Sequence, residues 1–391
     1  MKIISVVGAR PNFMKIAPFV RAIEKHNQSG LGEKVEHILV HTGQHYDVRM
    51  SEAFFSALNI PDPDINLEIG SGSHAEQVGY TMIAFEKVLH QHKPDWVVVV
   101  GDVNATLACS VTAKKENIRV CHIEAGLRSG DMAMPEEINR LVTDRLSDLL
   151  LTPDLLSNAN LKAEGVADER IQFVGNVMID TLEENRSKAE SISLAGIIQN
   201  NFHEGKRLEI EAGFPVQDNN IAVLTLHRPS NVDNPEILGN LLNFLMNEVC
   251  ADQPLLWTLH PRTEKRLKEF GLWHKIEEAK NLILLKPLGY HDMLRLNMAA
   301  RIMLTDSGGL QEECTVLGTP CLTLRWNTER PVTLKEHGGA SVLVGNNIER
   351  IRKEYRVAMT EDRHPVRPEL WDGHAAERCL AALLGKRVES S

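Results

Sequence analysis

The segment "KIISVVGARPNFMK", residues 2–15, joins an apolar, β-branched run to a glycine turn and then to the start of a helical pattern. A run this apolar, with no polar residue at alternate positions, is typical of a strand buried on both faces. The pattern that follows, "NFMKIAPFVRAIEKH", places apolar residues at helical spacing. The segment therefore predicts a strand, a tight turn and a covering helix, which is the unit of a parallel α/β sheet.

The same unit recurs along the chain. Short apolar runs alternate with longer amphipathic stretches such as "AEQVGYTMIAFEKVLHQH". Strands separated by helices form parallel sheets with helices on both faces. We predict strands over residues 3–7, 37–40, 96–100, 120–123, 148–151 and 171–174 in a first series, and 221–226, 255–259, 282–285, 301–304, 321–324 and 342–344 in a second.

A charged, Asn-rich and Glu-rich stretch over residues 180–218 interrupts the two series. We therefore predict two Rossmann-like α/β domains, over residues 1–176 and 177–369, with the boundary near residues 175–180. The tail "HAAERCLAALLGK" predicts one more helix. In open parallel sheets, ligands bind beyond the carboxyl ends of the strands, so two such domains predict a site in the cleft between them.

Composition narrows the class of protein. The 391 residues are 43% hydrophobic, and the longest apolar runs are far shorter than the roughly 20 residues needed to cross a bilayer. The N-terminus enters a strand at once, without a signal-peptide pattern, which predicts a cytoplasmic protein. A net charge of −10 argues against general nucleic-acid binding. Six scattered cysteines without a CxxC pair predict neither structural zinc nor disulfides, and the prolines around Asp62 make "DPD" a loop rather than a metal site.

Cations follow the first predicted strand. Arg10 and Lys15 lie within the first turns of a helix that opens after Gly8, which favours an anion site made by backbone amides and two positive side chains. A capped helix with solvated basic residues is the alternative. The spacing is not GxGxxG, so a dinucleotide fingerprint is absent.

Acids follow the next strands of the first series. Asp102 follows the strand 96–100 in "GDVNAT", where a helix cap is the alternative, and Glu124 follows the strand 120–123 in "HIEAGLRSG". In "MAMPEEINR", Glu136 and Glu137 follow a proline, which could be an ordinary helix start with a Glu136–Arg140 surface pair. Several acids converging with arginines on one rim instead favour acid–base chemistry there. Glu137 is interpreted as a helix-start residue only.

The second series repeats the arrangement. His227 follows the strand 221–226, and "LTDSGGLQEE" leads from a strand through Ser307, Gly308 and Gly309 into a helix. Glycines at that position let backbone amides approach a diphosphate at the positive end of the helix. A glutamate beside the phosphate would repel it, so Glu313 suits ribose hydroxyls. A plain glycine-containing turn is the alternative.

Taken together, these motifs resemble the non-hydrolysing UDP-N-acetylglucosamine 2-epimerases. The motifs that carry the resemblance run in consistent order from about residue 3 to 335: "GARPNFMK", "HTGQH", "GDVNAT", "HIEAGLRSG", "MPEEINR", "LHRPSN", "TDSGGLQEE" and "TERP". The resemblance implies a GT-B fold, a terminal helix over residues 370–391 that packs back on the first domain, and a cytoplasmic homodimer serving polysaccharide biosynthesis. It also implies reversible conversion of UDP-GlcNAc to UDP-ManNAc through elimination of UDP, with no cofactor and no metal.

The resemblance also assigns roles to residues. It implies catalytic roles for Asp102, Glu124, Glu136 and His227, with Glu124 or Glu136 as the proton-transfer group and Asp102 in support. It implies that substrate and UDP are bound by Arg10, Lys15, Arg140, Met293, Ser307, Gly308, Gly309, Glu313 and Arg325. Met293 stands where relatives often have an aromatic residue against uracil, with Tyr290 nearby. Asp47 stands where regulated members have glutamine, which argues against allosteric activation by a second UDP-GlcNAc.

Four alternatives stay open from the sequence. A hydrolysing relative would release ManNAc and UDP, and another relative would act on a UDP-2,3-diacetamido sugar. A GT-B glycosyltransferase would need an acceptor and would not exchange hydrogen at carbon 2. A nucleotide-sugar sensor would bind without turnover.

Overall fold

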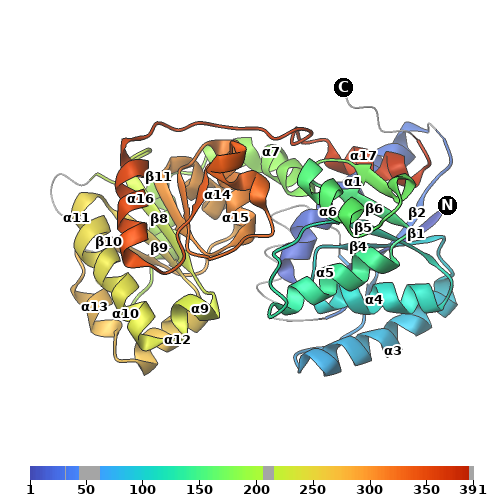
Figure 1. The fold of residues 1–391 in the computed structure, drawn as a ribbon, viewed down its shortest axis with the longest axis horizontal. Helices are drawn as coiled ribbons and strands as arrows, with labels where there is room; N and C mark the ends of the chain where they lie inside the picture. Colours follow the sequence, from blue (N-terminus) through green and yellow to red (C-terminus); the bar gives the residue numbers. More distant parts are fainter. Residues whose placement is uncertain (31, 44–61, 206–214, 387–391) are drawn as a thin grey trace. The chain divides into compact units, whose positions relative to one another are not determined.

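The computed structural model describes residues 1–30, 32–43, 62–205 and 215–386; the side chains of Arg10 and Pro11 lie outside this description. The chain divides into two compact units, Met1–Glu184 with Pro368–Ser391, and Asn185–Arg367. Figure 1 shows the elements of each unit. The sequence-based division between residues 176 and 177 falls just before helix α7 (Val177–Glu190), and it stays a prediction.

The first unit is built on a seven-stranded parallel sheet with the order β3-β2-β1-β4-β5-β6-β7. Its strands are β1 (Lys2–Val7), β2 (Glu36–His41), β3 (Ile65–Asn66), β4 (Trp96–Val100), β5 (Arg119–Ile123), β6 (Leu149–Thr152) and β7 (Ile171–Phe173). Its other helices are α1 (Arg10–Ser29), α3 (His74–His92), α4 (Asn104–Lys115), α5 (Pro135–Leu146), α6 (Leu155–Ala163), the short η1 (Asp168–Arg170) and α17 (Ala375–Leu383).

The second unit repeats the design with six parallel strands in the order β10-β9-β8-β11-β12-β13. The strands are β8 (Ile221–Leu226), β9 (Leu255–Leu259), β10 (Leu282–Leu285), β11 (Ala300–Thr305), β12 (Cys321–Thr323) and β13 (Ser341–Leu343). The helices are α8 (Leu194–Asn201), α9 (Pro229–Val232), α10 (Pro235–Phe244), η2 (Leu245–Val249), α11 (Cys250–Asp252), α12 (Pro261–Glu269), α13 (Trp273–Glu278), α14 (Tyr290–Ala299), α15 (Gly308–Leu317), η3 (Pro331–Thr333), η4 (Lys335–His337) and α16 (Ile348–Thr360).

Both faces of the second sheet are buried. Along β8, Ala222, Leu224 and Leu226 pack in a core with α10 and α16, whereas Ile221 and Val223 pack in a second core with α8 and α14. Successive side chains of a strand point to opposite faces, so covering both faces requires an unbroken apolar run. That is why these strands are visible in the sequence, and the predicted class of two parallel Rossmann-like α/β sheets is confirmed.

The C-terminal helix α17 belongs to the first unit. The Asp180 carboxylate accepts hydrogen bonds from the first two amides of α17, Ala375 N at 3.0 Å and Ala376 N at 2.7 Å. These are amides that a helix leaves without an internal partner. Trp371 adds a hydrogen bond from its indole to Pro153 O at 2.9 Å. The tail is therefore anchored on the first unit by buried polar groups.

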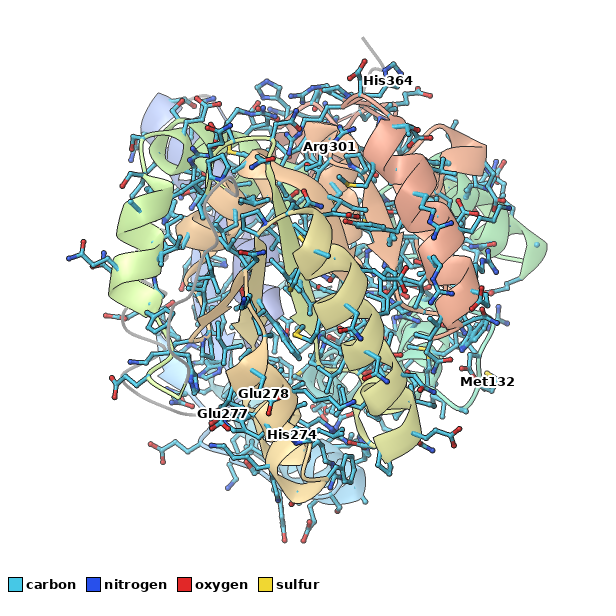
Figure 2. The ribbon with its side chains drawn as sticks, turned by 90° about the vertical axis from the view of Figure 1, so that its left-hand side faces the viewer. Met132, His274, Glu277, Glu278, Arg301 and His364 are labelled. Carbon is cyan, nitrogen blue, oxygen red and sulfur yellow. The ribbon has the colours of Figure 1, made fainter. Side chains whose placement is uncertain are left out.

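Each sheet has one topological switch point, where the chain leaves neighbouring strands in opposite directions. It lies between β1 and β4 in the first sheet and between β8 and β11 in the second. The crevice beyond the carboxyl ends of such a strand pair is the usual ligand site in doubly wound folds. Arg301, labelled in Figure 2, is the second residue of β11 and so lies near the opposite end of that strand.

Candidate functional site

The switch point of the first unit is crowded around Gly101, which follows β4. Gly101 has φ +68°, and a Cβ atom added there would lie 3.2 Å from Lys15 Nζ and 3.3 Å from both Asn12 Nδ2 and Glu124 Oε2. A left-handed backbone and such close neighbours both favour glycine. The turn therefore places Asp102, the next residue, beside the groups that come from α1 and from the end of β5.

Lys15 and Glu124 form a buried ion pair. Lys15 Nζ donates to Glu124 Oε2, and the two residues are only 7% and 6% exposed. Glu124 has φ +72°, a conformation that a non-glycine residue rarely adopts, and its amide donates to Leu151 O at 3.0 Å. Strained residues of this kind often occur at functional sites, where the surroundings hold them. The strained backbone of Glu124 thus directs its carboxylate towards Lys15.

Arg140 joins two acids at the start of α5. Its Nε and Nη2 atoms lie 3.0 and 2.5 Å from Asp102 Oδ2, and its Nη1 lies 2.5 Å from Glu137 Oε2. The Asp102 side chain stays 24% exposed while that of Arg140 is 3% exposed. The alternative of a Glu136–Arg140 surface pair is therefore wrong, because Arg140 turns inward to Asp102 and to the residue three positions before it.

Glu137 is more than a helix-start residue. Its carboxylate accepts from Ser129 N at 3.0 Å, Gly130 N at 3.0 Å and Ser129 Oγ at 3.0 Å, in addition to Arg140. Burial opposes its ionisation, but these amides and the guanidinium hold the pKa of Glu137 below its usual value. The carboxylate therefore ties the loop after β5 to α5. This loop carries the exposed Met132, labelled in Figure 2.

Glu136 differs from its neighbour. It is half-buried on the first turn of α5, and among the described residues its carboxylate has no hydrogen-bond or ion-pair partner. An acid in that condition is available to a ligand. The structure thus gathers two ion pairs, Lys15 with Glu124 and Arg140 with Asp102. Glu136, on the same helix α5 as Arg140, has no such partner among the described residues.

In the second unit, the switch point holds a buried aspartate under a histidine. Asp306 is fully buried and accepts from His227 N at 2.9 Å, Arg228 N at 2.8 Å and Asn231 Nδ2 at 3.1 Å. His227 Nδ1 lies 2.7 Å from Asp306 Oδ1, and the His227 side chain is 35% exposed. Burial opposes its ionisation, but these donors hold the pKa of Asp306 below its usual value. An ionised partner on Nδ1 fixes the ring tautomer and leaves Nε2 as the nitrogen for a ligand.

The glycine turn of the second unit lies against a balanced set of charges. A Cβ added to Gly308 would lie 2.8 Å from Glu329 Oε1 and 2.9 Å from Arg330 Nη1, whereas one added to Gly309 would meet nothing within 4 Å. Arg325 Nη2 donates to Glu329 Oε2 at 2.7 Å. The amides that open α15, with Ser307 as the N-cap, therefore carry the attraction for an anion, since Glu329 already offsets the nearest guanidinium groups.

Glu313 is a strongly perturbed acid of the second unit. It is fully buried on α15 beside Asn297 and Tyr290, and burial raises its pKa to about 7. Met293, on α14 with Tyr290, is half-buried and packs against the core cluster that contains Leu288 and Leu296. Glu313 and Met293, the residues predicted to contact ribose and uracil, thus lie on two helices, α15 and α14, that contact each other.

Some predicted positions lie outside the description. The Arg10 side chain and residues 44–47, which include Asp47, belong to that part. In the part of the chain that is described, no group of three or more His, Cys, Asp or Glu side chains is placed to hold a metal ion. Over the same residues, no helix is long and apolar enough to span a membrane.

Sequence reasoning missed two residues that the structure makes central. Asp306 lies inside the quoted motif "LTDSGGLQEE", but the sequence does not reveal that it pairs with a histidine 79 positions away. His122 opens the motif "HIEAGLRSG" and is fully buried. The only available signal was a polar residue adjoining an otherwise apolar strand end.

Comparison with known proteins is consistent across the chain. A family profile described as UDP-N-acetylglucosamine 2-epimerase matches residues 30–384. The UDP-N-acetylglucosamine 2-epimerase of Methanocaldococcus jannaschii is 41% identical over 386 residues, which covers 98% of this chain and 99% of that protein. A crystal structure of the M. jannaschii UDP-GlcNAc 2-epimerase in complex with UDP-GlcNAc and UDP matches with a TM-score of 0.85 and 39% identity, over 98% of this chain and 100% of the other.

A second relative is named for a different substrate. The UDP-2,3-diacetamido-2,3-dideoxy-D-glucuronate 2-epimerase of Pseudomonas aeruginosa is 39% identical over 350 residues, which covers 88% of each chain. Relatives of similar identity therefore carry names for two different sugars.

Proposed function

The chain belongs to the UDP-N-acetylglucosamine 2-epimerase family, and from that premise we propose that it interconverts UDP-GlcNAc and UDP-ManNAc. The observation that carries the proposal is the cluster of Asp102 and Glu124 with Arg140 and Lys15 at the switch point of the first sheet. A simple binding protein has no need for two acids paired one by one with buried cations at a strained strand end.

The chemistry explains why acids are needed. The hydrogen on carbon 2 of the sugar is not adjacent to a carbonyl, so its direct abstraction is slow. In the proposed path the bond from carbon 1 to the diphosphate oxygen breaks, UDP leaves with the electron pair, and a carboxylate takes the proton from carbon 2. The product is 2-acetamidoglucal. UDP then adds back to carbon 1 while a proton returns to carbon 2 from the opposite face, which calls for a second positioned acid.

The residues of the first unit suit these steps. We assign proton transfer to Glu124 or Glu136, with Asp102 in support. Glu136 is uncommitted and half-buried, so it can exchange protons with a ligand without breaking an ion pair. Glu124 can do so only while Lys15 compensates its charge. Arg10, Lys15 and Arg140 supply positive charge for the departing diphosphate.

The residues of the second unit suit the nucleotide. We assign the diphosphate to the amides of Ser307, Gly308 and Gly309 at the start of α15, with Arg325, and the ribose hydroxyls to Glu313. Met293 is assigned to the uracil. His227, held by Asp306, is assigned to the charge that develops on the departing phosphate oxygen.

The proposal includes a cytoplasmic homodimer that needs no cofactor and contributes to polysaccharide biosynthesis. These points rest on the family resemblance. Light scattering of the purified chain tests the dimer: a mass near twice 43.7 kDa supports it, and a monomer mass contradicts it.

The decisive experiment is incubation with UDP-GlcNAc in deuterated water, followed by proton NMR. UDP-ManNAc with deuterium at carbon 2 is the expected result. Free ManNAc with UDP would move the chain to the hydrolysing branch. Intact UDP-GlcNAc without deuterium would contradict the proposal and leave a glycosyltransferase or a nucleotide-sugar sensor.

A second candidate is epimerisation of a UDP-2,3-diacetamido sugar, favoured by the 39% identity to the P. aeruginosa enzyme. The same experiment with that sugar nucleotide separates the two. A kcat/KM at least about tenfold higher for UDP-GlcNAc, which corresponds to about 1.4 kcal/mol, supports the first assignment. The reverse ratio supports the second.

A further inference from the structure

His122 lies on β5 beneath the acid cluster, and both of its ring nitrogens face hydrogen-bond acceptors. Nδ1 is 2.6 Å from Asp144 Oδ1 and Nε2 is 2.9 Å from the carbonyl oxygen of Gly101. A neutral imidazole carries one hydrogen and would leave one of these contacts without a proton. The ring is fully buried, so no water competes for either position.

Asp144 does not supply the missing proton. Its Oδ2 accepts from Gly126 N at 3.0 Å and from Arg128 Nη1 at 2.7 Å. A backbone amide and a guanidinium on the same oxygen favour the ionised form of this carboxylate. An ionised carboxylate only accepts hydrogen bonds, as does a backbone carbonyl. Both hydrogens therefore have to come from His122.

The surrounding charges are compatible with a positive ring. Arg128 pairs with both Asp144 and Glu164, and it donates two hydrogen bonds of 2.7 Å to Glu164. On the side of Gly101, the paired Lys15 and Glu124 lie close to the glycine, and Arg140 holds the carboxylate of the next residue, Asp102. With His122 protonated, Asp144 has its own partner and Arg128 is left for Glu164. With a neutral ring, the only positive partner of the buried Asp144 carboxylate would be Arg128, which also pairs with Glu164.

The contacts of His122 connect the backbones of the two paired acids. Gly101 directly precedes Asp102, and Gly126, bound by Asp144, comes two residues after Glu124. Asp144 lies one turn after Arg140 on α5, so the same helix also binds the Asp102 side chain. A change at His122 would therefore shift Asp102 relative to Glu124, and a displacement of about 1 Å from a reacting group can cost roughly 100-fold in rate.

We propose that His122 is a positioning residue that carries a positive charge, donating both ring hydrogens to fix the separation of the two strand ends that bear Asp102 and Glu124. The proposal deepens the proposed function, since it assumes that these acids act on the sugar. Its charge state does not depend on that assumption. The first test therefore measures the ring itself.

That test is nitrogen NMR of the full chain labelled at histidine, recorded at about pH 7. His122 is expected to show two protonated ring nitrogens, because each ring nitrogen faces an acceptor. His37 provides the matched control in the same sheet: it is half-buried on β2, its Nε2 lies 2.9 Å from Ser5 Oγ, and desolvation lowers its pKa to about 4. Its ring should stay neutral. A single protonated nitrogen on His122 at about pH 7 overturns the proposal.

The second test compares His122→Gln with His37→Gln in the epimerisation assay. The side-chain amide of glutamine has one donor end and one acceptor end, so it cannot replace two N–H donors that point to Asp144 and to Gly101. H122Q should therefore lower kcat at least about tenfold while the KM for UDP-GlcNAc changes about twofold or less. H37Q should keep the wild-type kcat. Asp144→Asn serves if H122Q does not fold, and it should show the same split. Wild-type kcat in these variants overturns the positioning role, whereas an inactive wild-type chain would contradict the proposed function and leave the NMR result standing.

Discussion

At the switch point of the first sheet, carboxylates are held by side-chain cations, as Glu124 is by Lys15 and Asp102 by Arg140. At the switch point of the second sheet, the buried Asp306 is held mainly by backbone amides and a histidine, and the groups proposed to bind an anion are amides at a helix start. The strand order up to the switch point is the same in both sheets. Topology therefore decides where a site can form, and the residues after the strands decide its chemistry: acids paired with side-chain cations in one unit, and a histidine–aspartate pair with helix-start amides in the other.

The largest expected effect is on the acids of the first unit. Glu124→Gln and Glu136→Gln should each lower the rate of deuterium entry at carbon 2 on the order of 1000-fold if the residue transfers a proton. Only E124Q should also destabilise the fold, by about 3 kcal/mol, because it leaves the Lys15 charge buried without its partner.

Thermal unfolding and UDP binding measured beside the rates separate the two variants. Glu116→Gln, an acid of the same unit paired with His90 away from the switch point, is the control and should keep the rate. An E124Q rate equal to that of E116Q would contradict the role given to Glu124.

The next effect tests the aspartate of the second unit. Asp306→Asn keeps the shape but removes the charge that holds His227 Nδ1–H, so the ring can turn over to the other tautomer. We expect kcat to fall roughly 100-fold with a smaller change in KM. Steady-state kinetics across a range of pH measure this. A D306N variant with wild-type kcat would mean that His227 needs no orienting charge.

A smaller effect separates protein packing from ligand contact at the glycine turn. Gly308→Ala places a methyl group 2.8 Å from Glu329 Oε1 and 2.9 Å from Arg330 Nη1, and should cost about 1–3 kcal/mol of unfolding free energy. Gly309→Ala meets no protein atom within 4 Å and should leave stability unchanged or raise it by about 0.5–1 kcal/mol.

Both variants should weaken UDP binding, by about tenfold, if the diphosphate approaches these amides. Denaturant unfolding and titration calorimetry give the two quantities. Full UDP affinity in G309A would place the diphosphate elsewhere.

The smallest effect concerns the pH dependence of nucleotide binding. Glu313 has a pKa of about 7 in the free protein, and only its ionised form accepts hydrogen bonds from both ribose hydroxyls. Ligand affinity should therefore rise with pH through about 7, and fall roughly tenfold from pH 8 to pH 6, as expected when Glu313 must lose one proton before the ligand binds.

UDP-glucose is the probe, because its diphosphate diester does not titrate in this range whereas the terminal phosphate of UDP does. Glu313→Gln should bind more weakly and remove the pH dependence. A wild-type affinity that is flat between pH 6 and pH 8 would contradict the assignment of Glu313 to the ribose.

The sequence predicted most strands because their burial on both faces leaves apolar runs. The run "WVVVV" became β4 without a change of bounds, and residues 221–226 and 282–285 became β8 and β10 in the same way. The edge strand β3 was not predicted, because two residues carry no periodicity. Its place is set by pairing with Val40 and His41.

Site residues divide along the same line. Those that directly follow strands, such as Asp102, Glu124 and Ser307, could be selected from the sequence because strand ends gather at one edge of a parallel sheet. The partner of Arg140 could not be selected, because Glu136 and Glu137 both lie within one helical turn of it. The Ser129 and Gly130 amides draw Glu137 inward, and those contacts exist only once the loop after β5 has folded.

The sequence by itself determined the class of fold, the positions of the strand ends and the family, because each depends on local apolar pattern and on motifs in fixed order. The tertiary structure decided which charges pair: Lys15 with Glu124, Asp306 with His227, and His122 with Asp144. Those partners are 22 to 109 residues apart along the chain. The physical reason is that a buried charge must find compensation wherever the fold brings a partner within hydrogen-bond distance, and no local pattern records that distance.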